Sequence, residues 1–124
     1  MNRLVAALFA VAALINLIPI VGALSAGHLE SLYGFPVEHP NLEIVLRHRG
    51  VTIALVGALL AAAVVRPGLR SAAAVVGLTS MGTYVIFVGL VGDANEALMR
   101  VLYVDLVGLV SLAAGAFLER NRVA

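Results

Sequence analysis

Residues 4–24 read LVAALFAVAALINLIPIVGAL, a run without a charged side chain. A helix that crosses the hydrocarbon core of a bilayer needs about 20 apolar residues. Three further runs of suitable length and mostly apolar composition lie at residues 42–65, 71–91 and 101–118. The sequence therefore predicts an all-α fold, an integral membrane four-helix bundle in which residues 1–124 form a single transmembrane domain.

The overall composition also favours lipid as the solvent. Hydrophobic residues make up 62% of the chain and charged residues 12%, whereas soluble domains average about 45–50% and about 25%. A water-soluble chain this short could not bury so much apolar surface. The net charge of +1 argues against nucleic acid as a partner, and the absence of cysteine excludes disulfides and thiolate chemistry.

Arginine placement predicts the orientation. In a four-span topology, five arginines fall on one side of the membrane: Arg3, Arg66, Arg70, Arg120 and Arg122. Cytoplasmic loops carry the excess of basic residues, so we expect both termini inside. The basic residues are all arginine, and alanine, valine and glycine are abundant. This bias is typical of a GC-rich bacterium, and we expect a multi-pass protein of the bacterial inner membrane. The first run exceeds the apolar stretch of about 7–15 residues in a signal peptide, so we expect it to remain as a span.

The connection Ser25–Asn41 is long for so small a protein. Three of its apolar side chains share one face of a short helix: Leu29, Leu32 and Tyr33. We predict a capping loop between the first two spans that lies at the membrane interface. Asn41 is the expected N-cap of the second span, with Glu43 in its first turn.

Glycines recur seven residues apart on three of the predicted helices: Gly50 and Gly57, Gly82 and Gly89, Gly108 and Gly115. Small residues let membrane helices approach each other, and a seven-residue spacing keeps them on one stripe. We predict that these glycines face neighbouring helices, although glycine is abundant throughout this chain.

Polar side chains recur at similar depths on all four predicted helices. Counting about 1.5 Å per residue from the helix ends places them in one layer of the outer half: Asn16, Arg47, His48, Tyr84 and Asp105. Polar and ionisable groups inside a membrane are by default candidates for function. We therefore predict that this layer binds a ligand, and we find no matching layer in the inner half.

A purely structural interpretation of the same residues stays open. Glu43 and Arg47 are four residues apart and can pair along one helix face, and the arginines can extend to the headgroups. Asp105 can neutralise an arginine, so we expect it to approach Arg47 or Arg49. Asn16 can bond a neighbouring helix.

His48 is the one histidine inside a predicted span, and histidine titrates near neutral pH without perturbation. Together with Glu43 and Asp105 it forms our candidate set for acid–base catalysis. A functional His48 should be buried beside a cavity. The chain has no H-x-x-x-H or H-E-x-x-H spacing and no nucleotide fingerprint, so we predict neither a metal nor a cofactor.

Several short motifs carry a family resemblance: Leu32-Tyr33-Gly34, His39-Pro40-Asn41-Leu42, Arg47-His48-Arg49-Gly50, Asn95-Glu96-Ala97 and, later, Asp105. Over essentially its whole length the chain resembles small four-helix bacterial membrane proteins near the DoxX-like families. The resemblance implies a four-helix bundle and, by analogy, a subunit of a respiratory or redox-stress complex. Some look-alikes carry the label phosphopantetheine adenylyltransferase. That soluble family uses an H-x-G-H motif on a Rossmann-like sheet, and this chain has neither.

Three classes of function remain. The first is a non-enzymatic membrane protein that binds an apolar, lipid-like molecule, a second copy or a partner subunit through the outer polar layer. The second is a membrane-embedded isomerase or hydrolase of a lipid-like substrate, in which His48 moves protons and Arg47 stabilises negative charge. The third is a small dimeric exporter, although such exporters place an acid midway along the first helix, where this chain has Asn16.

Overall fold

The structure is a computed structural model that describes residues 2–123, and every regular element in that range is helical. The elements in chain order are α1 (Arg3–Leu17), η1 (Ile18–Ala23), α2 (Ala26–Tyr33), α3 (Pro40–Val65), η2 (Pro67–Leu69), α4 (Arg70–Val91) and α5 (Glu96–Val123). Four stretches are helical, long and apolar enough to cross a membrane: Arg3–Ala23, Pro40–Val65, Pro67–Val91 and Glu96–Arg122. The prediction of four such helices is confirmed, and they indicate a multi-pass membrane protein.

The helices begin and end somewhat differently from the predicted runs. α5 begins at Glu96 rather than at Val101, because the Asn95 side chain accepts a hydrogen bond from the Leu98 backbone N–H and caps the helix. The prediction that Asn41 caps α3 is wrong. The His39 side chain accepts from the Asn41 backbone N–H, since Pro40 opens the helix at a position where its missing N–H is not needed.

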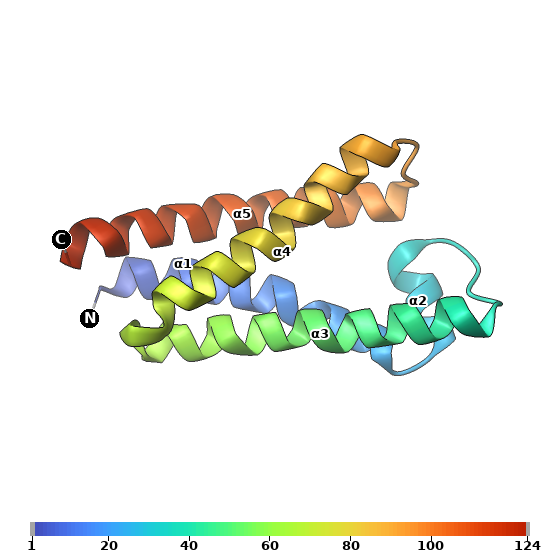
Figure 1. The fold of residues 1–124 in the computed structure, drawn as a ribbon, viewed down its shortest axis with the longest axis horizontal. Coiled ribbons are helices and arrows are strands. Elements are labelled where there is room, and N and C mark those ends of the chain that lie inside the picture. Colours follow the sequence, from blue (N-terminus) through green and yellow to red (C-terminus); the bar gives the residue numbers. More distant parts are fainter. Residues whose placement is uncertain (1, 124) are drawn as a thin grey trace.

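The four long helices run along a common direction, and the connections define two ends. Figure 1 shows both chain termini and the α3–α4 connection at one end, which we name the terminal end. α2 and the α4–α5 connection lie at the other, which we name the α2 end. α4 lies against α3 near the terminal end and diverges from it towards the α2 end (Figure 1).

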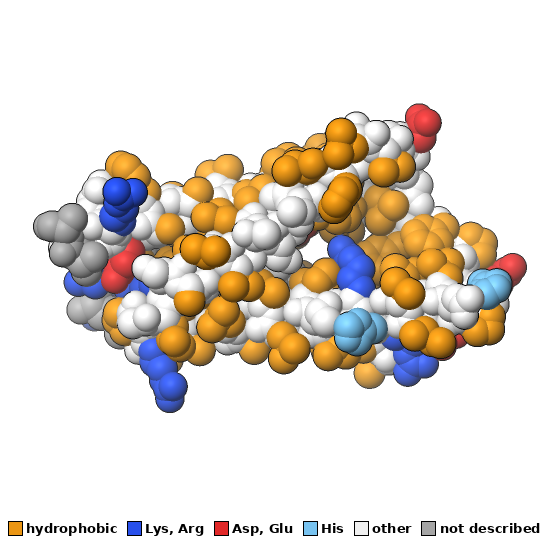
Figure 2. Space-filling model, in the orientation of Figure 1, with side chains coloured by type: hydrophobic (Ala, Val, Ile, Leu, Met, Phe, Trp, Pro, Cys, Tyr) orange, Lys and Arg blue, Asp and Glu red, His pale blue; other side chains and the backbone are white. Residues whose placement is uncertain are grey.

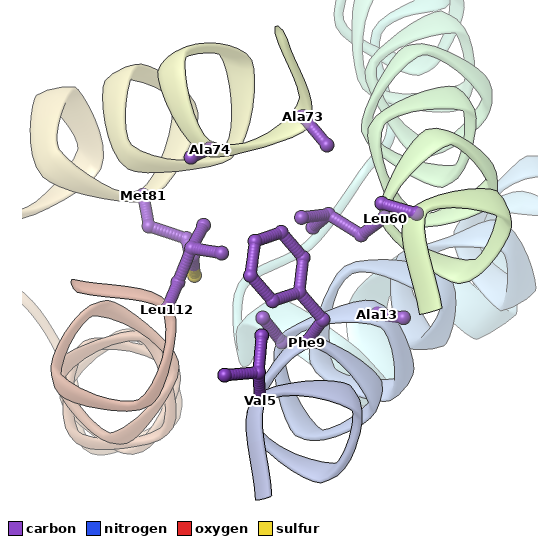
Figure 3. Packing of buried hydrophobic residues seen from close by; sticks show 10 residues of the cluster. Val5, Phe9, Ala13, Leu60, Ala73, Ala74, Met81 and Leu112 are labelled. Atoms are coloured by element: carbon purple, nitrogen blue, oxygen red, sulfur yellow. The ribbon is translucent and has the colours of Figure 1, made fainter. Parts of the chain in front are cut away.

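An apolar core fills the terminal end. The Phe9 ring of α1 is fully buried and lies among side chains from the other three long helices (Figure 3). Leu60 of α3, Ala73 of α4 and Leu112 of α5 surround it and are equally inaccessible. This cluster joins all four helices and anchors the bundle at the end where α3 and α4 are close together.

A buried arginine closes the same end. Arg70 is 1% exposed and donates at 2.9 Å to the carbonyls of Ala63 and Val64. It also forms a 2.9 Å ion pair with Glu119, and its guanidinium lies 5.7 Å from the Phe9 ring centroid. The sequence placed Arg70 in a connection, whereas in the structure it begins α4 and folds back over the last carbonyls of α3.

The seven-residue glycine stripes face neighbouring helices on α3 and α5, but on α4 only the first glycine of the pair approaches another helix. A Cβ at Gly57 would lie 2.9 Å from the Leu17 backbone nitrogen, and one at Gly108 would lie 2.6 Å from Met81 Sδ. By contrast, a Cβ at Gly82 would have its nearest neighbour at 4.0 Å, and one at Gly89 would meet nothing within 4 Å. The prediction for α4 is wrong at Gly89, because this part of the helix has diverged from α3 (Figure 1).

Candidate functional site

The divergence of α4 leaves a cavity of about 380 Å³ near the α2 end. Its walls come from α2 and all four long helices, and its apolar lining includes Ile15, Leu32, Ile53, Val101 and Val104. Its polar lining consists of Asn16, Ser31, Tyr33, Arg49, Ser80, Tyr84, Arg100 and Asp105. Figure 2 shows a hollow between α3 and α4 on this face, with an arginine side chain (blue) at its rim. Binding sites for small molecules have volumes of about 300–1,000 Å³ and mostly apolar walls, so this cavity is large enough to hold one.

One wall of the cavity is the point where α1 changes into η1. Pro19 has no N–H to donate to the carbonyl of Ile15, and the α-helix ends at Leu17. Just before this break, Asn16 is 2% exposed and donates to the Ala12 carbonyl at 2.8 Å. Its amide also lies 3.5 Å from Met81 Sδ, so it contributes polarity to the wall while bonding within the bundle.

A guanidinium held between two aromatic rings forms the polar centre of the cavity. The Arg49 guanidinium carbon lies 5.2 Å from the Tyr33 ring centroid and 5.7 Å from that of Tyr84. Arg49 also donates a hydrogen bond to the Tyr33 hydroxyl. Burial raises the pKa of the Tyr33 phenol above its ordinary value, which keeps that ring neutral. Cation–π contacts of this kind orient the guanidinium.

Both tyrosines are held in place by contacts to α5. The Tyr84 hydroxyl donates to the Leu98 carbonyl at 2.9 Å. The Asn95 side-chain amide donates to the Tyr33 carbonyl at 2.8 Å. A Cβ at Gly34, which caps α2 with φ +71°, would lie 2.9 Å from the Ala97 Cβ, so α2 ends tightly against the start of α5. The Tyr84 hydroxyl is therefore held by a backbone carbonyl of α5. The backbone of Tyr33, at the end of α2, is held by the side chain of Asn95.

Comparison with known proteins adds no family to this geometry. No family profile, curated protein or solved structure matches the chain. The resemblance to proteins near the DoxX-like families therefore stays a prediction, and the functional argument rests on the residues themselves.

The structure brings three of the five predicted ligand-binding residues to one cavity. Asn16, Tyr84 and Asp105 all line it. Their roles in binding stay predictions. The similar depth of these residues along three different helices therefore correctly indicated that they lie close to one another.

The other two predicted ligand-binding residues lie outside the cavity lining. Arg47 is exposed and pairs with Glu43 at 3.0 Å, and its Nε donates to the Ala23 carbonyl at 3.0 Å. His48 is exposed as well, so the expectation that it lies buried beside a cavity is wrong. The acid–base set of His48, Glu43 and Asp105 is not brought together.

The register of α3 explains why Arg49 takes their place. Gly50 faces η1, where its Cβ would lie 2.6 Å from the Pro19 carbonyl oxygen. Each residue turns the helix by about 100°. His48 therefore points about 200° away from the Gly50 direction, to the far side of α3. Arg49 and Ile53 lie on the flank that lines the cavity. The glycine stripe was a signal that could have identified this flank from the sequence.

Asp105 and Arg49 share the cavity without pairing. Asp105 is partly buried and lines the cavity opposite α3, but it forms no ion pair with Arg47 or Arg49. Asp105 and Arg49 line one cavity, as the predicted approach requires, but no ion pair joins them within residues 2–123, where Arg49 contacts the aromatic rings and Arg47 pairs with Glu43. The cavity lining thus contains one carboxylate, Asp105, that forms no direct ion pair with the Arg49 guanidinium.

Four further polar lining residues were not among the predicted site residues: Ser31, Tyr33, Ser80 and Arg100. Arg100 was assigned to a connection because the apolar run begins at Val101, whereas α5 begins at Glu96. As for metals, residues 2–123 contain no group of three His, Asp or Glu side chains that could hold one.

Proposed function

We propose that this chain binds a lipid-like molecule within the membrane, in the cavity between α3, α4 and α5. The observation that carries the proposal is the cavity itself, whose mostly apolar walls surround a single aromatic–guanidinium centre at Arg49. Small-molecule sites combine apolar walls with a few placed polar groups in this way. A molecule with one long apolar part and one polar group matches such a lining.

The proposal places the cavity in the outer half of the bundle, with both termini in the cytoplasm. The arginine-rich terminal end carries Arg66 and Arg120, both exposed, and basic residues favour the cytoplasmic side. In this orientation α2 covers the outer end of the cavity through Ser31, Leu32 and Tyr33. A ligand then reaches the cavity from the outer leaflet.

A second hollow supports access from the side. A groove of about 190 Å³ is lined by Tyr33, Phe35, Leu46, Arg49, Tyr84 and Leu98. It shares Tyr33, Arg49 and Tyr84 with the main cavity. The groove and the cavity therefore meet at the aromatic–guanidinium centre, on the side where α4 diverges from α3 (Figure 1). An apolar chain can pass between these helices without crossing water.

Filling the cavity tests the proposal. Ile53 lines the cavity, whereas Leu55 is 64% exposed and lies two residues further along the same helix. We expect Ile53→Trp to exclude the ligand and Leu55→Trp to leave binding unchanged. Native mass spectrometry of the delipidated protein, titrated with palmitic acid and with hexadecanol in a neutral detergent, measures binding directly.

The pair of variants makes the outcome clear. If Ile53→Trp binds neither palmitic acid nor hexadecanol while Leu55→Trp binds both, the result supports binding in this cavity. Equal binding by both variants and the original chain would place the ligand elsewhere on the surface. Absence of binding by the original chain would refute the proposed function.

A further inference from the structure

We infer that the ligand carries one anionic group, a carboxylate or a phosphate, which the Arg49 guanidinium binds inside the cavity. This inference rests on the proposed function and adds the chemical class of the ligand. Three observations carry it: the free donors of Arg49, the charge of the cavity, and the place of Arg49 between two apolar hollows.

The Arg49 guanidinium is held in place, but most of its N–H donors have no hydrogen-bond acceptor within residues 2–123. A guanidinium has five N–H donors in a planar fork, and within residues 2–123 its one hydrogen-bond acceptor is the Tyr33 hydroxyl. The Tyr33 and Tyr84 rings lie beside the guanidinium carbon, and apart from the one N–H that the Tyr33 hydroxyl accepts, its donors stay available to a ligand. Arginine binds carboxylate and phosphate oxygens through two parallel hydrogen bonds from that edge.

The charges that line the cavity favour an anion. Two arginines, Arg49 and Arg100, and one acid, Asp105, contribute to the lining. Arg100 is exposed and is the more easily solvated of the two. Arg49 is partly buried and forms no ion pair in the part of the chain that the structure describes. Charged groups inside a membrane protein usually form ion pairs or take part in function. A monoanion bound beside Arg49 brings the net charge of the cavity lining to zero.

A cationic headgroup fits the same site poorly. The faces of Tyr33 and Tyr84 are the surfaces that would attract it, and the Arg49 guanidinium already occupies them. A cation at Asp105 would also share the cavity with two arginines. A bound cation and these arginines would repel each other. The two aromatic rings therefore orient a guanidinium that binds an anion, and they do not form a cage for a cation.

The surroundings of Arg49 show that the anion carries an apolar chain. On the groove side, Phe35, Leu46 and Leu98 lie around the opening. On the cavity side, Ile53 and Val104 line the wall. A small hydrated anion would have to lose its water among these apolar side chains. An acyl chain attached to the anion covers them, and burial of that chain offsets the loss.

The experiment compares ligands that differ in the headgroup alone. Palmitic acid, hexadecanol and inorganic phosphate are titrated against the full chain in neutral-lipid nanodiscs, with native mass spectrometry as the measurement. The variants are Arg49→Gln and His48→Gln. His48 is the matched control because it is the neighbouring residue on the same helix, is exposed, and lies outside the cavity lining. Circular dichroism checks that both variants are folded.

We expect the original chain and His48→Gln to bind the acid about tenfold more tightly than the alcohol, because hydrogen bonds to charged groups are strong. Arg49→Gln should remove this preference and leave the affinity for the alcohol unchanged. Equal affinities for acid and alcohol in the original chain would overturn the inference and leave the proposed function standing.

Two other outcomes would also overturn the inference. Binding of inorganic phosphate at the affinity of palmitic acid would show that the apolar chain contributes nothing, and that the site takes a soluble anion. Absence of binding by both the acid and the alcohol would refute the proposed function together with the inference.

Discussion

The side-chain amide of Asn95 donates a 2.8 Å hydrogen bond to the backbone carbonyl of Tyr33, the last residue of α2. The same side chain accepts a 2.8 Å hydrogen bond from the Leu98 N–H and so caps α5. One asparagine therefore starts one helix and holds the end of another. Because Tyr33 contacts Arg49, Asn95 links the position of α2 to the polar centre of the cavity.

Asn95→Asp separates these two roles. A carboxylate still accepts from the Leu98 N–H, but it has no N–H to offer the Tyr33 carbonyl. We expect the melting temperature to change little, while amide hydrogen exchange across α2 becomes about fivefold faster, since a hydrogen bond contributes about 1 kcal/mol. Exchange is measured by mass spectrometry on nanodisc samples. Asn95→Ala, which loses the bond from the Leu98 N–H and those to the Tyr33 and Gly34 carbonyls, should also lower the melting temperature. Unchanged exchange in Asn95→Asp would show that α2 is held by other contacts.

Two glycine substitutions test the packing of α3 against that of α4. A Cβ at Gly57 would lie 2.9 Å from backbone atoms of both Asn16 and Leu17, and backbone cannot move aside cheaply. We expect Gly57→Ala to lower the free energy of unfolding by about 1–3 kcal/mol, as overpacking does. Gly89→Ala meets nothing within 4 Å and should be neutral or stabilising by up to about 1 kcal/mol. Unfolding in mixed detergent micelles measures both, and equal effects would contradict the divergence of α4.

Two arginines near the same turn test the buried ion pair. Arg70 is 1% exposed and bonds Glu119 and two carbonyls of α3, whereas Arg66 is exposed. Glu119 keeps its 2.8 Å pair with Arg122 when Arg70 is removed, but two α3 carbonyls lose a charged donor, and hydrogen bonds to charged groups contribute about 1.5–3 kcal/mol each, so Arg70→Ala should lower the melting temperature strongly. Arg66→Ala should leave it within the range of surface substitutions, about 0.5 kcal/mol. Similar melting curves for the two variants would mean that Glu119 and the α3 carbonyls need no partner there.

Reporter fusions test the orientation. Gly68, in the α3–α4 connection, and Glu38, between α2 and α3, are both exposed and lie at opposite ends of the bundle (Figure 1). The arginine bias predicts a cytoplasmic signal from a fusion at Gly68 and an external signal from one at Glu38. Reversed signals would place the cavity in the inner leaflet. They would leave its chemistry unchanged.

The sequence was sufficient for features that depend on length and periodicity. Four apolar helices follow from run length alone. The contacts of Gly57 and Gly108 follow from a seven-residue repeat. The same repeat did not predict the surroundings of Gly89 correctly. Whether a glycine there meets a neighbouring helix depends on how α4 diverges from α3, which is a property of the whole bundle.

Side-chain direction was harder to predict than depth. Asn16, Tyr84 and Asp105 meet in the cavity because depth along a helix is a simple count of residues. Arg47, His48 and Arg49 have nearly the same depth, and one residue of rotation decides which of them enters the cavity. That rotation is fixed by contacts such as Gly50 against Pro19, which connect segments far apart in the sequence.

The last prediction concerns Asp105, for which sequence and structure give opposite expectations. A paired Asp105 would make Asp105→Asn destabilising, because the substitution leaves an arginine without its partner. In the structure Asp105 is partly buried and forms neither an ion pair nor a side-chain hydrogen bond within residues 2–123. A partly buried carboxylate that accepts no hydrogen bond is itself unfavourable. We therefore expect Asp105→Asn to keep or raise the melting temperature.

The same variant should bind an anionic amphiphile more tightly. Asp105 and Arg49 line one cavity, so removal of the negative charge lowers the repulsion felt by a carboxylate there. We expect the affinity for palmitic acid to rise at least about threefold and the affinity for hexadecanol to stay constant. Asp93→Asn is the control, because Asp93 lies in the α4–α5 connection with φ 55°, a conformation that asparagine also tolerates. If Asp105→Asn alone melts several degrees lower and binds palmitic acid more weakly, then Asp105 holds Arg49 in place after all, and the anion site requires both charges.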